Sequence, residues 1–190
     1  MSNKNILMSV CWVLLMFAPL ISDAAKWKVY ENATLIENDF NDGDSFHVMC
    51  NKYHYIFRLY YVDTPETSAS YPQRVQDQAD YFGITVKQAL KIGADATKFT
   101  DKLLSKKSFT VYTKKEDARG NSKRKRYFAM IKVGDDWLST LLVEEGFARV
   151  YGKRIDLPEH GKPIRKYSAR LRSTERKAKK EKKGAWKLAK

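Results

Sequence analysis

Two short acidic segments and one arginine have spacings suited to phosphate chemistry. The first segment is Asp42-Gly43-Asp44-Ser45, and the second is Asp63-Thr64-Pro65-Glu66. Arg58 lies five residues before the second segment. Oxygen-only donors of this kind suit Ca²⁺ or Mg²⁺, and an arginine fork can donate two hydrogen bonds to a phosphate. The residues therefore indicate a hard metal ion acting on a phosphate, and the alternative is a structural ion pair at a strand end.

The second acidic segment ends a stretch with the composition of a strand. Tyr55–Val62 is rich in aromatic and β-branched residues, which predicts a buried strand. Pro65 prevents the strand from continuing and biases Thr64 toward an extended conformation. We therefore expect Asp63 and Glu66 at a strand end, where a rigid scaffold positions side chains for function.

Five strands and about three helices are expected after residue 25. The predicted strands are Ala33–Ile36, Ser45–Cys50, Tyr55–Val62, Phe109–Thr113 and Tyr127–Val133. The predicted helices are Val86–Leu104, Trp137–Glu145 and a basic helix that closes the chain, and Thr67–Gln78 is expected to be polar and irregular. A helix between the third and fourth strands favours an α+β fold built on a five-stranded Greek-key β-barrel of the OB type.

Residues 1–24 have the pattern of a secretory signal peptide. Lys4 precedes an apolar run that extends to Ile21, and small residues follow it. The run is short for a membrane-spanning helix, which needs about 20 residues. We therefore expect cleavage after Ala24 rather than an uncleaved membrane anchor, and a secreted or periplasmic protein. Residues 25–190 then form one domain whose single cysteine, Cys50, excludes an internal disulfide.

The positive charge is concentrated near residue 190. The net formal charge is +14, and residues 162–190 hold 13 Lys or Arg against two acidic residues. A segment this basic favours polyanions, either nucleic acid or an anionic membrane surface. Apolar and small residues recur along it every three or four positions, so one helix face can dock on the domain while the other stays basic.

Taken in order, the motifs resemble those of the staphylococcal-type thermonucleases. The resemblance rests on D-G-D at 42–44, R-L-x-x-V-D-T-P-E at 58–66, the strand that follows Arg126, and Leu142–Val150, and it spans about residues 31–187. It implies an endonuclease that hydrolyses DNA and RNA with little sequence preference and leaves 3′-phosphate ends. The alternative is an OB-fold module that binds nucleic acid without catalysis.

The resemblance also implies three catalytic residues. Arg58 is expected to bind the phosphate, Glu66 to act as the general base for the attacking water, and Arg126 to stabilise the transition state. The family carries Tyr-Gly-Arg where this chain has Lys123-Arg124-Lys125-Arg126. Arg124 therefore remains an alternative to Arg126, and Lys123 and Arg124 are candidate contacts to a neighbouring phosphate.

The oxygen donors favour Ca²⁺ as the cofactor, because an irregular turn suits the flexible coordination of Ca²⁺. Its expected ligands are the carboxylates of Asp44 and Asp63 and the carbonyl of Thr64, supplemented by water. Asp42 either ligates the ion or supports the site by accepting backbone hydrogen bonds in the turn.

Further substrate contacts are less well defined. Tyr151 and Tyr112 are candidates for base stacking or phosphate contact, or for core packing. Thr67–Thr85 is longer than in the simplest relatives, and we expect an ordinary surface insertion, the alternative being a cover over the substrate groove. We expect a monomer with DNA and RNA as substrates, no obligate protein partner, and at most weak contact with anionic membranes.

Overall fold

The computed structural model describes residues 26–106, 108–120, 123–158 and 163–190. The predicted signal peptide, residues 1–24, lies outside the described residues. Among the helices within those ranges, none combines the length and the apolar character that crossing a membrane requires.

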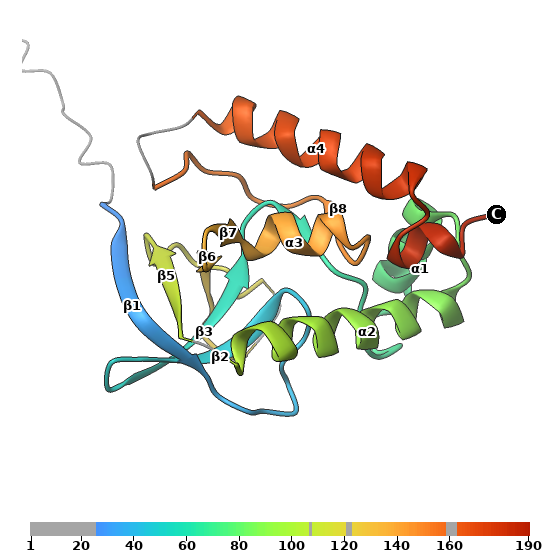
Figure 1. Cartoon of the computed structure of the whole chain (residues 1–190). Helices are drawn as coiled ribbons and strands as arrows, with labels where there is room; N and C mark the ends of the chain where they lie inside the picture. Colours follow the sequence, from blue (N-terminus) through green and yellow to red (C-terminus); the bar gives the residue numbers. More distant parts are fainter. Residues whose placement is uncertain (1–25, 107, 121–122, 159–162) are drawn as a thin grey trace, which may run out of the picture.

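Five strands close into a barrel (Figure 1). They are β1 (Lys28–Leu35), β2 (Ser45–Cys50), β3 (Tyr53–Leu59), β5 (Phe109–Thr113) and β6 (Tyr127–Val133). The strands pair antiparallel in the order β3-β2-β1-β5-β6, and parallel pairing of β3 with β6 closes the ring. A short strand, β7 (Asp136–Trp137), extends β6 as a hairpin. The predicted α+β fold with a five-stranded OB-type barrel is confirmed.

The predicted strand Tyr55–Val62 is broken, and the break redirects the chain. β3 ends at Leu59, and Tyr61 adopts a left-handed conformation with φ of 74°. This conformation costs a residue with a side chain about 1–2 kcal/mol, which burial of the whole tyrosine offsets. Beyond it, β4 (Val62–Asp63) pairs with β8 (Arg149–Val150), so that Asp63 is opposite Arg149. The prediction of one continuous strand is wrong, because the chain turns out of the barrel before Asp63.

Three of the α-helices agree with the predicted ones. α2 (Val86–Leu104) has the predicted bounds and begins with a capping box in which Thr85 and Gln88 satisfy each other's backbone N–H groups. α3 (Leu138–Glu144) and the basic α4 (Ile164–Lys180) also occur where the sequence indicates helices. α3 lies between α4 and the barrel (Figure 1).

A fourth helix, α1 (Pro72–Phe82), begins inside Thr67–Gln78, the stretch predicted to be irregular, and runs beyond it. Pro72 stands in its first turn, where a missing N–H is tolerated. The buried face of the helix combines three apolar residues with one polar residue, namely Val75, Gln78, Ala79 and Phe82. The prediction failed because Gln78 interrupts the apolar pattern and Pro72 suggests a loop.

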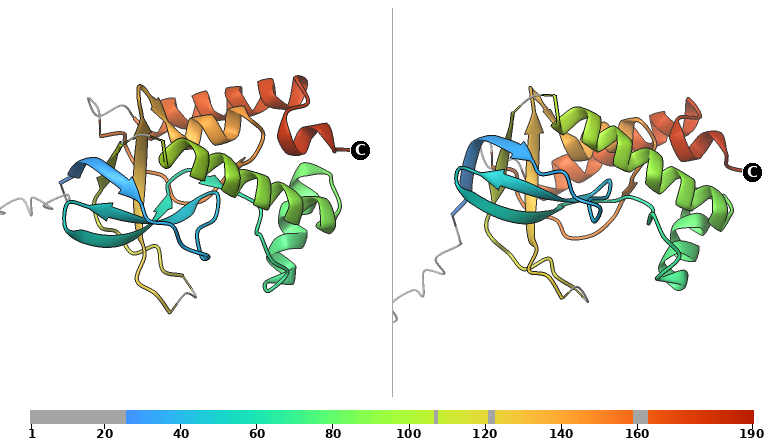
Figure 2. Two further views of the ribbon diagram at one scale, coloured as in Figure 1. Left: turned by 60° about the horizontal axis from the view of Figure 1, so that its bottom comes forward. Right: turned by 90° about the horizontal axis from the view of Figure 1, so that it is seen from below.

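α1 lies outside the barrel, beside α2 and the C-terminal 3₁₀ helix η1 (Gly184–Lys187) (Figures 1 and 2). These three elements share an apolar cluster that is separate from the barrel core. Within it, the rings of Phe82 and Trp186 lie 4.7 Å apart between centroids. The cluster anchors α1 next to the chain segment that follows β4, which carries the acidic residues described below.

Candidate active site

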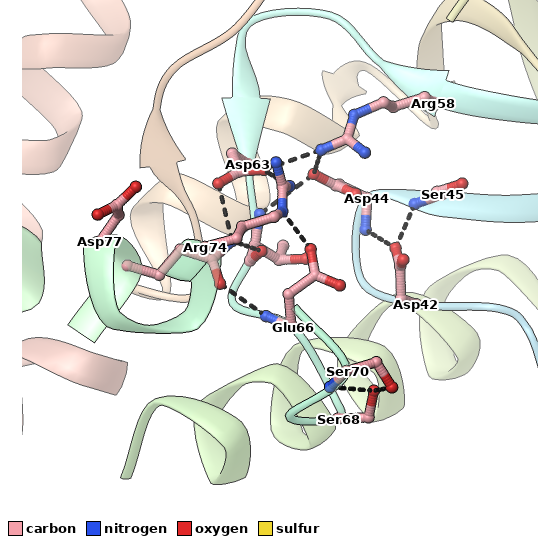
Figure 3. Close-up of polar contacts among 12 residues, drawn as sticks. Asp42, Asp44, Ser45, Arg58, Asp63, Glu66, Ser68, Ser70, Arg74 and Asp77 are labelled. Carbon is pink, nitrogen blue, oxygen red and sulfur yellow. Dashed lines mark hydrogen bonds and ion pairs between the residues drawn. The ribbon is translucent and has the colours of Figure 1, made fainter. Parts of the chain in front are cut away.

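Two buried carboxylates from different parts of the chain meet at one arginine (Figure 3). Asp44 immediately precedes β2 and Asp63 ends β4, and only 2% and 1% of their surfaces are exposed. Nη2 of Arg58, on β3, lies 3.2 Å from Asp44 Oδ2 and 2.8 Å from Asp63 Oδ1. The fold thus brings together three residues that the sequence singles out.

The loop before β2 is held in a shape that fixes Asp44. Asp42 Oδ1 accepts the backbone N–H groups of Asp44 at 3.0 Å and of Ser45 at 2.6 Å. At Gly43, a Cβ atom would lie 2.8 Å from the Cβ atom of Ala96 in α2, so a side chain has no room there. These hydrogen bonds are the supporting role that the sequence left open for Asp42 beside direct ligation.

The turn that carries Glu66 packs against both α2 and α1. At Gly93 of α2, a Cβ atom would lie 2.5 Å from the carbonyl oxygen of Pro65 and closer still to that of Glu66. Glycine weakens a helix by about 1 kcal/mol relative to alanine, and here it permits the helix to touch the turn. On the other side, Gln78 donates to the Thr64 carbonyl and accepts the Glu66 N–H, each at 2.9 Å.

Three residues that sequence reasoning missed complete the cluster. Arg74 of α1 donates to both Asp63 and Glu66 (Figure 3). The side chains of Gln78 and Arg149 each donate to Asp63 Oδ2 at 2.9 Å. Gln78 had one signal in the sequence, a polar residue on the apolar face of a helix, whereas Arg74 had none.

The expectation that residues 67–85 form an ordinary surface insertion is wrong. The helix within this segment delivers Arg74 and Gln78 to the carboxylates. The fully buried side chain of Gln78 donates a hydrogen bond to the Thr64 carbonyl and accepts one from the Glu66 N–H. The segment is therefore part of the site's framework.

Arg126 lies beside the carboxylates, and Arg124 does not share that position. Arg126 Nη1 donates to Ser45 Oγ at 3.3 Å, and its buried Nε has no hydrogen-bond partner among the described residues. Burial and the neighbouring charge of Arg58 lower the pKa of Arg126, so an added anion would be stabilised there. Arg124 lies in the loop before β6, with its guanidinium 4.3 Å from the centre of the exposed Phe40 ring.

The two candidate tyrosines lie in different environments. Tyr151 is 54% exposed, and the guanidinium of Arg149 lies 4.4 Å from its ring centre, so it adjoins the cluster. Tyr112 is partly buried and packs edge-on against Trp137, with 5.4 Å between ring centres. The geometry leaves Tyr151 accessible for base stacking and gives Tyr112 a packing role.

Lys123 is exposed in the loop before β6.

The surroundings of Asp42 and Asp44 favour an added cation. Burial, and then repulsion by Asp44, raises the pKa of Asp42 well above its ordinary value. Burial also raises the pKa of Asp44, where attraction by Arg58 opposes the shift and repulsion by Asp63 adds to it. Protonation or a bound cation would relieve both effects.

The available donors fit Ca²⁺ in their chemistry. Within the described ranges, no three His, Cys, Asp or Glu side chains form a group that could hold a metal ion. The site instead offers the carboxylates of Asp44 and Asp63 with the carbonyl of Thr64, which leaves the remaining positions to water. Such an all-oxygen set suits Ca²⁺, which accepts varied coordination geometries.

Comparison with known families gives an independent result. The model of the staphylococcal nuclease homologue family matches residues 56–188, more than two thirds of the chain. The match includes all three predicted catalytic residues, whereas Asp42 and Asp44 precede it and reach the site through the fold. No curated protein matches the chain.

Proposed function

The chain belongs to the staphylococcal nuclease homologue family, and we propose that it is a Ca²⁺-dependent endonuclease that hydrolyses phosphodiester bonds of DNA and RNA. We propose that it cleaves with little sequence preference and leaves 3′-phosphate ends, as the family resemblance implies. The observation that carries the proposal is the bridge from Arg58 to Asp44 and Asp63, with Glu66 in the same cluster. Binding of nucleic acid alone requires cations and gives no reason to bury carboxylates beside them.

The metal-binding groups in this proposal are the carboxylates of Asp44 and Asp63 and the carbonyl of Thr64, with Asp42 in support. A bound divalent cation neutralises charge on the phosphate that is attacked. Arg58 binds the same phosphate, since a guanidinium stays charged and has several N–H donors in one plane. Only Nη2 of this group is used in the two carboxylate bridges.

Glu66 and Arg126 have different proposed roles in the reaction. Glu66 is the proposed general base for the attacking water, and its side chain is 24% exposed, which gives water access to it. General-base catalysis of this kind contributes about 10²–10⁴-fold to a rate. Arg126 supplies a buried N–H donor without a partner in the described chain, suited to the negative charge that develops on the phosphate.

Substrate binding in this proposal depends on phosphates and on stacking, so it weakens steeply with salt. Lys123 and Arg124 are proposed phosphate contacts, and Tyr151 is a proposed stacking contact. The exposed basic face of α4 adds attraction for polyanions and allows weak contact with anionic membranes. We propose a secreted or periplasmic monomer, released by cleavage after Ala24, without an obligate protein partner.

A non-catalytic OB-fold module that binds nucleic acid is the second candidate. The observation in its favour is the basic α4, in which eight Lys or Arg residues are exposed. These residues are Arg165, Lys166, Arg170, Arg172, Arg176, Lys177, Lys179 and Lys180. Such a surface would attract nucleic acid whether or not the carboxylate cluster is active.

Hydrolysis of single-stranded DNA separates the two candidates. The protein is assayed with Ca²⁺ and with a calcium chelator, beside a Glu66→Gln variant that keeps the shape of the side chain. Cleavage that persists in this variant would reveal contaminating nucleases. Cleavage that requires Ca²⁺ and falls by orders of magnitude in Glu66→Gln supports the nuclease. Salt-sensitive binding without cleavage, equal in both proteins, supports the binding module.

A further inference from the structure

The hydrogen-bonding capacity of Asp63 is fully used in the structure. A carboxylate offers about four acceptor positions. Asp63 Oδ1 accepts from Arg58 and Arg74, and Oδ2 accepts from Gln78 and Arg149. A cation can therefore coordinate Asp63 only after at least one of these four donors has left.

The four donors differ in how firmly they are held. Gln78 is fully buried and also bonds the backbone of the turn at residues 64–66. The side chain of Arg149 is 9% exposed on the strand paired with β4, and that of Arg58 is 19% exposed and bridges to a second carboxylate. The side chain of Arg74 is 33% exposed and comes from the helix outside the barrel. Because a guanidinium near water regains hydration when its ion pair breaks, Arg74 leaves at the lowest cost.

Arg74 holds a second carboxylate at the same time. Its Nη2 donates to Asp63 while its Nε donates to Glu66, so the side chain lies between them (Figure 3). One movement of Arg74 therefore vacates one acceptor position of Asp63 and releases the side chain of Glu66.

We propose that Arg74 is a positioning residue that occupies Asp63 in the metal-free protein and couples metal binding to the release of Glu66. This inference rests on the proposed function, since it uses the roles of Asp63 as metal ligand and Glu66 as general base. Arg74 competes with the metal ion for one carboxylate and restrains the other, so the metal-free site holds its base in an ion pair.

Replacing Arg74 by methionine removes the competing charge and keeps an apolar stem of similar length. We expect Arg74→Met to bind Ca²⁺, and Tb³⁺ as a luminescent probe, more tightly by on the order of tenfold, as is typical of coupled sites. The Ca²⁺ concentration for half-maximal DNA hydrolysis falls by the same factor. A role in structure alone would weaken metal binding instead. Arg74→Lys keeps the charge but loses the planar fork that reaches both carboxylates. Its affinity for Ca²⁺ should fall between those of the wild type and Arg74→Met.

The test is calorimetric titration of Ca²⁺ into metal-free protein, purified after expression of the full chain, with thermal unfolding recorded for each variant. Lys87→Met is the matched control, because it removes the same charge from an exposed position in the first turn of α2. An Arg74→Met affinity equal to or below that of the wild type overturns the inference. If that variant does not fold, the same comparison is decided on Arg74→Lys.

The outcomes also separate this inference from the proposed function. A wild-type protein that binds no Ca²⁺ and cleaves no DNA refutes the proposed function, and the inference fails with it. A wild type that binds Ca²⁺ and cleaves DNA, with an unchanged affinity in Arg74→Met, refutes only the role of Arg74.

Discussion

Gly93→Ala perturbs the proposed active site through α2, the helix that packs against the turn carrying Glu66. An added Cβ atom would lie 2.5 Å from the Pro65 carbonyl oxygen, whereas Cβ contacts below 3.0 Å essentially do not occur. The turn or α2 must therefore move by at least about 0.5 Å. Glu66 follows Pro65 directly, so the displacement reaches the proposed general base.

Gly93→Ala is expected to lower both the activity and the stability of the protein. A misplacement of about 1 Å costs on the order of 100-fold in rate, so we expect kcat/KM to fall by about 10- to 100-fold. Overpacking destabilises by about 1–3 kcal/mol, while alanine regains about 1 kcal/mol of helix propensity. The net destabilisation of Gly93→Ala should be about 0–2 kcal/mol.

Ca²⁺-dependent hydrolysis of single-stranded DNA and urea unfolding measure the two effects. Gly134→Ala is the control, because Gly134 has φ of 61° with nothing within 4 Å, so alanine there strains the backbone away from the site. It should destabilise the protein and leave kcat/KM unchanged. A folded Gly93→Ala protein with wild-type kcat/KM would refute the claim that α2 positions Glu66.

Three further predictions follow from other parts of the molecule. Arg126→Lys should lower kcat by about 10²–10³-fold, whereas Arg124→Lys should change KM more than kcat, as steady-state kinetics will show. Burial raises the pKa of the Cys50 thiol to about 11 from an ordinary value near 9. The folded state then holds the thiol proton more tightly, so the stability that the neutral thiol contributes below pH 9 should be lost as the pH rises toward 11. Urea unfolding should show a loss of at most about 1.4 kcal/mol per pH unit. Lys123→Gln should weaken DNA binding similarly for all sequences and reduce the salt slope by about 0.7 for single strands.

Local pattern was sufficient for most of the barrel. The bounds of β2, β5, β6 and α2 equal the predicted ones, because alternating or periodic apolar residues and a capping box are properties of adjacent residues. The motifs also identified the family, since their order and spacing are retained in the chain. The same reasoning failed at Tyr61 and in α1, where burial of a tyrosine and of a glutamine overrides local preference.

The acidic residues of the site and Arg58 were readable from the motifs, but the partners of Asp63 were not. Its donors lie between 5 residues away, for Arg58, and 86 residues away, for Arg149. Which of them reach it depends on the turn at Tyr61, on the pairing of β4 with β8, and on α1 docking beside α2. Residue types and short-range order thus specified the elements and the chemistry, whereas the arrangement of charges around Asp63 arose from packing between distant segments, which no local pattern encodes.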